Sequence, residues 1–314
     1  MRFGVIVSAP TRGSYLDAVA RAEQLGYDVA LCSDHLELGG RHSSHFTPIP
    51  ALTAAAMATA RLRIGTSVIN QDLRHPALLA RDAASLDVLS GGRLELGLGA
   101  GWAEREYTMA GMQFDPIGVR VRRFAEYVAV VKGVLAEPAF SFEGEFFKIS
   151  GMPGEPAPAQ APIPPIMIGA TGPKLLRLAA READIVSINM LKAPEPTPAA
   201  LAERVSWVRE AAGKRFERLE LQMTLAAVIP AKELPERALA RRIADGDPFL
   251  ARLAERIGVE GLAQSPLILV GDPQQMTERL LALTDDHGIG YVMVPMMFME
   301  ALGDVIPYTR GGQG

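Results

Sequence analysis

Residues 165–174 read Pro165-Ile166-Met167-Ile168-Gly169-Ala170-Thr171-Gly172-Pro173-Lys174. The continuous apolar run Ile-Met-Ile is typical of a strand that is buried on both faces of a parallel sheet. Small residues follow this run, and Pro173 stands where the first turn of a helix tolerates a missing N–H group. The segment therefore predicts a strand that passes directly into a helix, which is the repeating unit of a parallel α/β fold.

The same alternation of a short apolar run and a longer helical segment recurs along the chain. It predicts strands at residues 3–8, 28–33, 63–69, 94–99, 165–169, 184–188, 220–228 and 290–295. Helices are expected at 14–25, 49–60, 76–90, 119–135, 173–182, 198–212 and, in two or three pieces, 235–283. Eight successive βα units favour a closed (β/α)8 TIM barrel over an open sheet.

The composition is that of a globular protein, and the length, which corresponds to about two average domains, leaves the number of domains open. The chain has 314 residues, of which 48% are hydrophobic and 22% charged, and this composition excludes a disordered chain. A single α/β barrel routinely takes this length. We therefore expect one domain over residues 1–314, with an insertion near 138–165. There, residues 140–151 alternate like a hairpin that turns at Glu143-Gly144, and residues 152–165 contain six prolines, which predicts a stiff connection.

Charge and cysteine content limit the kinds of partner. The chain carries 32 Lys and Arg residues against 36 Asp and Glu residues, for a net charge of −4. The basic residues are scattered, so neither a nucleic-acid surface nor a membrane surface is expected. Cys32 is the single cysteine and cannot form an intrachain disulfide. With no signal peptide and no transmembrane run in the sequence, we expect a soluble, cytoplasmic protein that acts on a small molecule.

Reactive residues of a βα barrel lie at the C-terminal ends of its strands, where the following loops converge. After the second predicted strand comes Ser33-Asp34-His35-Leu36, in which His35 is a candidate for proton transfer near neutral pH. His42 and His45 follow in the same loop, and together with His35 and Asp34 they could be drawn as a metal site. Glycines and serines around them mark a surface loop, so we favour solvated histidines and predict no metal.

The turn from Gly169 to Lys174 is a candidate phosphate site. It runs from a strand into a helix, so its backbone N–H groups and the helix N-terminus could hold a phosphate, with Thr171 and Lys174 as further donors. It lacks the full spacing of a Walker motif. A small-residue turn without any ligand is the alternative.

A second glycine-rich segment, Gly97-Leu98-Gly99-Ala100-Gly101, follows the fourth predicted strand. It imitates a dinucleotide fingerprint, but its third glycine arrives one residue early, so we discount a Rossmann site. The glycines would instead let a flat ring approach the backbone closely, with Trp102 and Glu104 at the border of the pocket. A tight strand exit is the alternative interpretation.

Taken together, these segments resemble the bacterial-luciferase-like superfamily of flavin-type barrels, and within it the oxidoreductases that use the deazaflavin coenzyme F420. The resemblance implies hydride transfer between coenzyme F420 and a small organic substrate. An FMN-dependent two-component monooxygenase of the same superfamily is the alternative, because both cofactors present a tricyclic ring and a phosphate. The resemblance covers nearly the whole chain and is carried by Phe3-Gly4-Val5, Ser33-Asp34-His35-Leu36, Ile64-Gly65-Thr66-Ser67-Val68, residues 93–102 and residues 269–276.

The resemblance also implies roles for individual residues. Asp34 would contact the deazaflavin ring, and His35 would exchange a proton with the substrate. Ser67 and Val68 would be joined by a non-prolyl cis peptide that forms a bulge behind the ring. The other cofactor contacts would come from Gly99, Ala100 and Gly101 along the ring, and from Gly169, Ala170, Thr171, Gly172 and Lys174 at the phosphate.

Glu104 lies in the neighbourhood of an active-site acid of some relatives and is the second predicted catalytic residue. Trp102 and Ala103 depart from the sequences of those relatives. The apolar residues near Trp102, Met190 and 293–299 suggest a hydrophobic or unsaturated organic substrate.

The resemblance further implies a homodimer through the early helices. The alanine-rich segment 49–60 could form that contact, although burial against the barrel explains its composition equally well. Two functions from other classes stay open as alternatives. One is a metal-dependent barrel hydrolase, and the other is a cofactor-binding relative without enzymatic activity.

Overall fold

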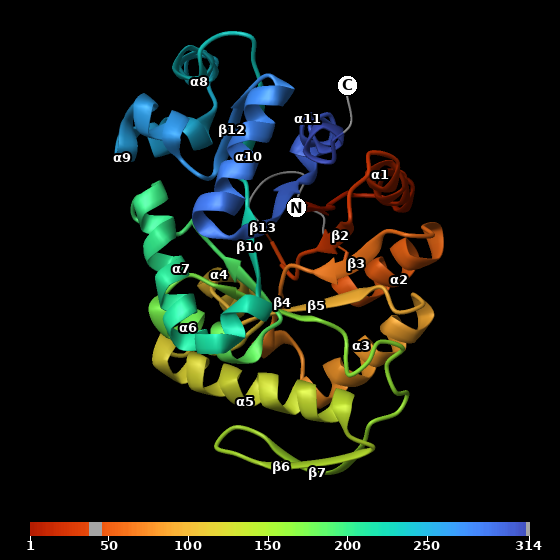
Figure 1. Ribbon diagram of the computed structural model, residues 1–314. Helices are drawn as coiled ribbons and strands as arrows, with labels where there is room; N and C mark the ends of the chain where they lie inside the picture. Colours follow the sequence, from red (N-terminus) through yellow and green to blue (C-terminus); the bar gives the residue numbers. More distant parts are fainter. Residues whose placement is uncertain (38–45, 312–314) are drawn as a thin grey trace.

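The computed structural model describes residues 1–37 and 46–311 and has a closed barrel of parallel strands at its centre (Figure 1). Neighbouring strands pair in parallel, and the pairing of β3 with β5 closes the ring. The predicted (β/α)8 TIM barrel is confirmed. Its eight strands are β1 (Arg2–Ile6), β2 (Val29–Cys32), β3 (Arg63–Thr66), β5 (Leu94–Gly99), β8 (Ile166–Ala170), β9 (Ile185–Ile188), β10 (Glu220–Thr224) and β13 (Ile289–Pro295).

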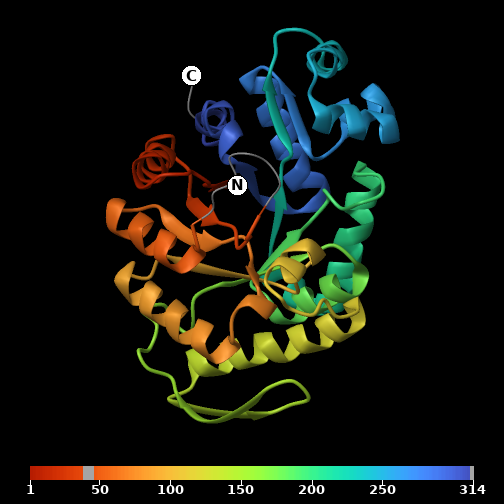
Figure 2. The same cartoon turned by 180° about the vertical axis from the view of Figure 1, so that it is seen from behind.

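Helices surround the barrel in both views (Figures 1 and 2). The strands β2, β5 and β9 are buried along their whole length, as expected for strands covered on both faces. Each long helix contributes a buried stripe that packs on the strands, and these stripes form the main core. The helices that follow the barrel strands are α1 (Arg12–Gln24), α2 (Pro48–Ala58), α3 (Pro76–Leu89), α5 (Ile117–Ala136), α6 (Pro173–Glu182) and α7 (Pro198–Ala212).

A network of charges holds the N-terminal end of the barrel. Glu95 in β5 has 1% of its side chain exposed, and its carboxylate accepts hydrogen bonds from the guanidinium groups of Arg2 in β1 and Arg63 in β3, the latter at 2.6 Å. Arg2 also pairs with Glu220 in β10 at 2.6 Å. Four strands are thus linked at the end of the barrel where they begin.

One predicted strand is broken at the opposite end of the barrel. The expected strand 63–69 ends at Thr66, and the chain resumes as β4 (Ile69–Asn70), which pairs with the last residues of β5. The break falls at Ser67 and Val68, whose peptide bond is cis, as the family resemblance implies.

A second predicted strand leaves the barrel. The expected strand 220–228 stays in the barrel only to Thr224, and its continuation β11 (Ala227–Pro230) pairs in parallel with β12 (Ile268–Gly271). The region 235–283 was expected to hold two or three helices, and it holds three, but the strand β12 between the last two was not expected, because a short apolar run does not distinguish a strand from a buried helical turn. The helices of this region are α8 (Pro235–Ala244), α9 (Pro248–Gln264) and α10 (Pro273–His287), which lie with β11 and β12 beside one end of the barrel (Figure 1).

A hairpin lies in the segment where the insertion was expected. β6 (Ala139–Glu143) and β7 (Lys148–Pro153) pair in an antiparallel manner and pack on α5 from outside the helix ring (Figure 1). The proline-rich connection that follows is tied to α3, because the side-chain amide of Gln160 donates to Asp87 at 2.7 Å. None of the described helices is long and apolar enough to cross a membrane.

Candidate active site

Three barrel strands meet around the side chain of Val68. A methyl group placed on Gly99, at the end of β5, would lie 2.5 Å from Cγ2 of Val68, and one placed on Gly169, in β8, would lie 3.3 Å from Cγ1 of Val68. Val68 also packs on the cluster of buried side chains inside the barrel. The predicted residues Val68, Gly99 and Gly169 therefore lie together, and the absence of side chains on the two glycines makes room for the side chain of Val68.

Asp34 follows β2 and is fixed to the neighbouring loop. It is 6% exposed. Its carboxylate accepts a hydrogen bond from the backbone N–H of Asn70 at 3.2 Å and forms an ion pair with the guanidinium of Arg74. Asn70 and Arg74 lie in and just after β4, so the loops after β2 and β4 are held together by this one carboxylate.

His35 faces a second buried carboxylate, that of Glu106. The Nδ1 atom of His35 lies 2.9 Å from Oε1 and 3.2 Å from Oε2 of Glu106. Oε1 also accepts hydrogen bonds from the backbone N–H groups of Leu36 at 3.0 Å and Glu37 at 3.1 Å. The loop after β2 is therefore anchored on Glu106 as well as on the loop after β4.

Glu106 belongs to α4 (Glu104–Met109), a helix that the sequence analysis did not predict. Glu104, the acid that was predicted, is exposed at the first position of this helix, whereas Glu106 and Tyr107 are buried. Residues two positions apart in a helix are separated by about 200° around the helix axis. The side chains of Glu104 and Glu106 therefore point to different sides. The catalytic role of Glu104 stays a prediction, and Glu106 is the acid that contacts His35.

The glycine-rich exit of β5 is tightly packed. Gly101 has a φ of +73°, and a methyl group placed on it would lie 1.8 Å from the hydroxyl of Tyr107. That hydroxyl donates to Asn70 Oδ1 at 3.0 Å or to Asp72 Oδ2 at 2.7 Å. The guanidinium of Arg120 donates to the carbonyl groups of Ala100, at 3.3 Å, and Gly101. Only glycine fits at position 101, and the exit of β5 is tied to the loop after β4.

Trp102 stands at the rim of this end of the barrel and is 56% exposed. Its ring meets that of His35 edge to face at 5.6 Å, and Nζ of Lys192, from the loop after β9, lies 3.9 Å from its centroid. Leu191, next to Lys192, lines a cavity of about 200 Å³ against α9. Of the methionines expected near the pocket, Met190 and Met293 are buried and Met297 is exposed.

The predicted phosphate turn lies at the end of β8. Its first two residues belong to the strand, Thr171 is half-buried, and Gly172 and Lys174 are exposed. α6 starts at Pro173, and no side chain caps its first turn. An uncapped helix start favours a bound anion, because its N–H groups lack partners and the helix dipole is positive there.

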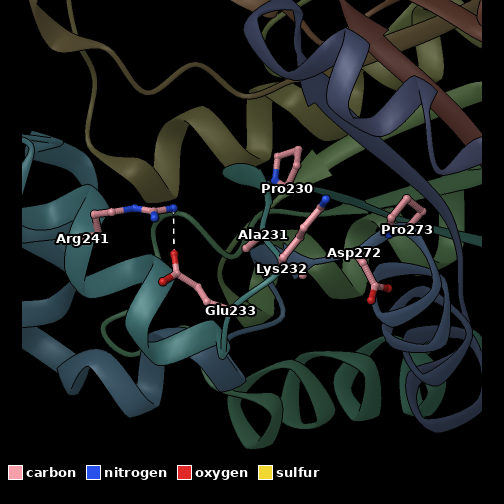
Figure 3. A pocket seen from close by; sticks show the side chains of 8 residues that line it. Pro230, Ala231, Lys232, Glu233, Arg241, Asp272 and Pro273 are labelled. Atoms are coloured by element: carbon pink, nitrogen blue, oxygen red, sulfur yellow. Dashed lines mark ion pairs between the residues drawn. The ribbon is translucent and has the colours of Figure 1, made fainter.

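A cavity of about 580 Å³ lies apart from these residues, at the ends of β11 and β12 (Figure 3). Glu233 and Arg241 form an ion pair at 2.7 Å on its wall, and Lys232 and Asp272 also line it. None of the predicted active-site residues lines this cavity. Its two cations and two carboxylates give no net charge that would select a ligand.

Metal ligands are not gathered in the part of the chain that the structure describes. No three His, Cys, Asp or Glu side chains come close enough together there to hold a metal ion. His42 and His45, on which the metal interpretation depends, lie outside the described residues.

Comparison with known proteins identifies relatives over nearly the whole chain. The F420-dependent glucose-6-phosphate dehydrogenase of Nakamurella multipartita is 30% identical over 304 residues, which cover 91% of this chain and 88% of that protein. The enzyme of the same name from Kribbella flavida is 28% identical over 99% of this chain and 98% of its own length.

Solved structures share the fold. An F420-dependent secondary alcohol dehydrogenase in complex with an F420-acetone adduct has a TM-score of 0.79 at 20% identity, over 98% of this chain and 99% of that chain. A monooxygenase from Streptomyces bottropensis has a TM-score of 0.78 at 21% identity, over the same shares. The family described as luciferase-like monooxygenase matches residues 1–289. The chain therefore belongs to the luciferase-like monooxygenase family.

Proposed function

We propose that this protein is an oxidoreductase that transfers a hydride between coenzyme F420 and a small organic substrate. The supporting observation is spatial: the loops after β2, β4, β5 and β8 lie side by side at one end of the barrel and bring His35, Asp34, Val68 and the start of α6 to the same rim. Relatives that match almost the full chain are named as F420-dependent dehydrogenases.

The residues at this rim fit a flat ring with an anionic tail. Gly99 and Gly169 have no side chains, so Val68 packs directly on their backbone atoms, and we expect the planar ring to lie against Val68. The start of α6 and the ammonium of Lys174 suit the phosphate. When bound, the deazaflavin would supply the carbon that gives or accepts the hydride. We assign the remaining contacts with the cofactor to Asp34, Ser67, Ala100, Gly101, Ala170, Thr171 and Gly172.

His35 is the group that we assign to proton exchange with the substrate. Its Nδ1 faces Glu106, and its Nε2 makes no hydrogen bond with residues 1–37 or 46–311. Nε2 is therefore the ring atom available to a substrate. The exposed side chain of Leu36 is next to His35 in the chain, and the exposed ring of Trp102 contacts the imidazole, which favours an apolar or unsaturated organic molecule.

The cofactor assignment is tested by titrating the purified protein with oxidised and reduced F420 and, in parallel, with FMN. We expect ring absorbance and fluorescence to change on addition of F420 and not on addition of FMN. Tight binding of FMN without binding of F420 would reverse the assignment in favour of a two-component monooxygenase. The complex with F420 is then assayed with glucose 6-phosphate, secondary alcohols and unsaturated ketones, and a substrate is a compound that changes the redox state of F420.

We further infer a cytoplasmic homodimer that forms through α2 and α3. These two helices contact each other, and Met57 in α2 and Leu78 and Leu89 in α3 are exposed apolar side chains. Leu78 and Leu89 are eleven residues apart and so share one face of α3. Light scattering on the eluted protein should give twice the mass of the chain, and Leu78→Asp should give one chain mass. A wild-type monomer would contradict the proposal.

A further inference from the structure

The carboxylate of Glu106 receives donors from three consecutive residues of one loop. Oε1 lies 2.9 Å from Nδ1 of His35, 3.0 Å from the N–H of Leu36 and 3.1 Å from the N–H of Glu37. The Glu106 side chain is 4% exposed and that of His35 is 16% exposed. A carboxylate is stable in such a buried position only when hydrogen-bond donors surround it.

This arrangement decides which nitrogen of His35 carries a proton. An ionised carboxylate only accepts hydrogen bonds, so Nδ1 of His35 must donate to Glu106. In the neutral imidazole the other nitrogen, Nε2, then has a free lone pair. Orientation by a second group is the general way in which proteins fix the tautomer of a functional histidine.

α4 is held in the position that this contact needs. Tyr107, the next residue, is buried, and its hydroxyl bonds to Asn70, the last residue of β4, and to Asp72, just after that strand. The two buried side chains of α4 therefore contact the loops after β2 and β4. Glu104 is exposed at the start of the same helix and has no part in these contacts.

We propose that Glu106 is the positioning residue of the active site: it holds His35 in the Nδ1–H tautomer and directs Nε2 toward the substrate. The proposal rests on the proposed function for its chemical meaning, because the proton that His35 exchanges is the one that accompanies hydride transfer. The tautomer itself is a property of the protein alone and is measurable without cofactor or substrate.

The decisive experiment is nitrogen NMR of the imidazole groups in the full-length protein. The chain has five histidines, so the signal of His35 is identified by its loss in His35→Asn. We expect the Nδ1–H tautomer in the wild type and a mixture of tautomers in Glu106→Gln, whose amide places an N–H group beside Nδ1. Glu106→Asp keeps the charge and should restore the Nδ1–H form in part, and Glu104→Gln is the matched control that should leave the spectrum unchanged.

Turnover provides the second readout, with the substrate found in the F420 assay. In Glu106→Gln we expect kcat to fall by about tenfold to a hundredfold, with KM and F420 affinity within about twofold of the wild type. A wild-type imidazole spectrum in Glu106→Gln, or an Nε2–H tautomer in the wild type, would overturn the proposal. A failure to bind F420 would instead overturn the proposed function and leave the tautomer measurement intact. If Glu106→Gln does not fold, the wild type and Glu106→Asp carry the test. A complete Nδ1–H form in the wild type and a partial one in Glu106→Asp would support the proposal, and an Nε2–H form in the wild type would overturn it.

Discussion

The two ends of the barrel each contain a buried carboxylate, and the partners of the two carboxylates differ in kind. At the N-terminal end, Glu95 is held by the guanidinium groups of Arg2 and Arg63. At the C-terminal end, Glu106 is held by two backbone N–H groups and by the imidazole of His35. A guanidinium keeps its charge at every ordinary pH, whereas an imidazole gains and loses its proton near neutral pH.

This difference in partners gives the two carboxylates different roles: Glu95 stabilises the barrel, and Glu106 supports its chemistry. The network of Glu95 joins four strands through guanidinium groups that keep their charge, so it suits the closure of the barrel. The contact of Glu106 involves a side chain whose protonation can change during a reaction. The same division between a stabilising face and a reactive face is general in βα barrels, whose active sites lie at the C-terminal ends of the strands.

The largest effect is expected when Glu95 is replaced by alanine. The guanidinium groups of Arg2 and Arg63 then lose their shared partner, and breaking a buried ion pair in this way destabilises a protein by about 3 kcal/mol or more. Urea unfolding should show a loss of this size in the free energy of unfolding, while the folded protein still binds F420. The control is Glu143→Ala, which removes an exposed ion pair with Lys148 and should leave stability unchanged. Equal losses in both variants would contradict a structural role for the network.

Replacement of His35 by asparagine tests the other end of the barrel. Asparagine retains an N–H group for Glu106 but cannot exchange a proton, so we expect turnover to fall by about a hundredfold or more. Stability and F420 affinity should remain close to those of the wild type. His35→Asn should therefore lose turnover and keep stability, whereas Glu95→Ala should lose stability. His287→Asn, at the end of α10, is the matched control. Unchanged turnover in His35→Asn would remove His35 from the mechanism.

The eight barrel strands were predictable from the sequence because apolar runs between helices leave few alternatives in a parallel sheet, whereas the strand β12 outside the barrel was not. Asp34, Val68, Gly99 and Gly169 could be predicted as site residues because strand ends converge in this fold and because their segments resemble those of the family. Whether Glu104 or Glu106 turns inward was not predictable. α4 has six residues, too few for a periodic pattern, and the buried direction is set by loops that are distant in sequence.

A smaller effect is expected at the phosphate turn. Lys174 is exposed beside the start of α6, so solvent weakens any contact that it makes with an anion. We expect Lys174→Ala to weaken F420 binding by about tenfold, which is about 1.4 kcal/mol, without a change in kcat. Titration of Lys214→Ala, another exposed lysine, provides the control. Equal affinity of the two variants would mean that the phosphate lies elsewhere.

The smallest effect on activity is expected at Cys32, which lies at the end of β2 beside the reactive loop. Its thiol is buried, and burial raises its pKa to about 12. The thiol therefore stays protonated at neutral pH and offers no thiolate for chemistry at the mouth of the barrel. Cys32→Ala should retain wild-type turnover and F420 affinity, and a large loss of turnover would place Cys32 in the mechanism.

The same thiol makes stability depend on pH in a definite direction. In the unfolded chain the Cys32 thiol has an ordinary pKa of 9.0, so above pH 9 the unfolded state releases a proton that the folded state keeps. The free energy of unfolding therefore falls as the pH rises, and this one group accounts for about 1.4 kcal/mol between pH 8 and pH 10. Cys32→Ala should lose less stability than the wild type over that interval by this amount, as measured by urea unfolding at both pH values. Parallel pH curves for the two proteins would show that the thiol is not held protonated by the fold.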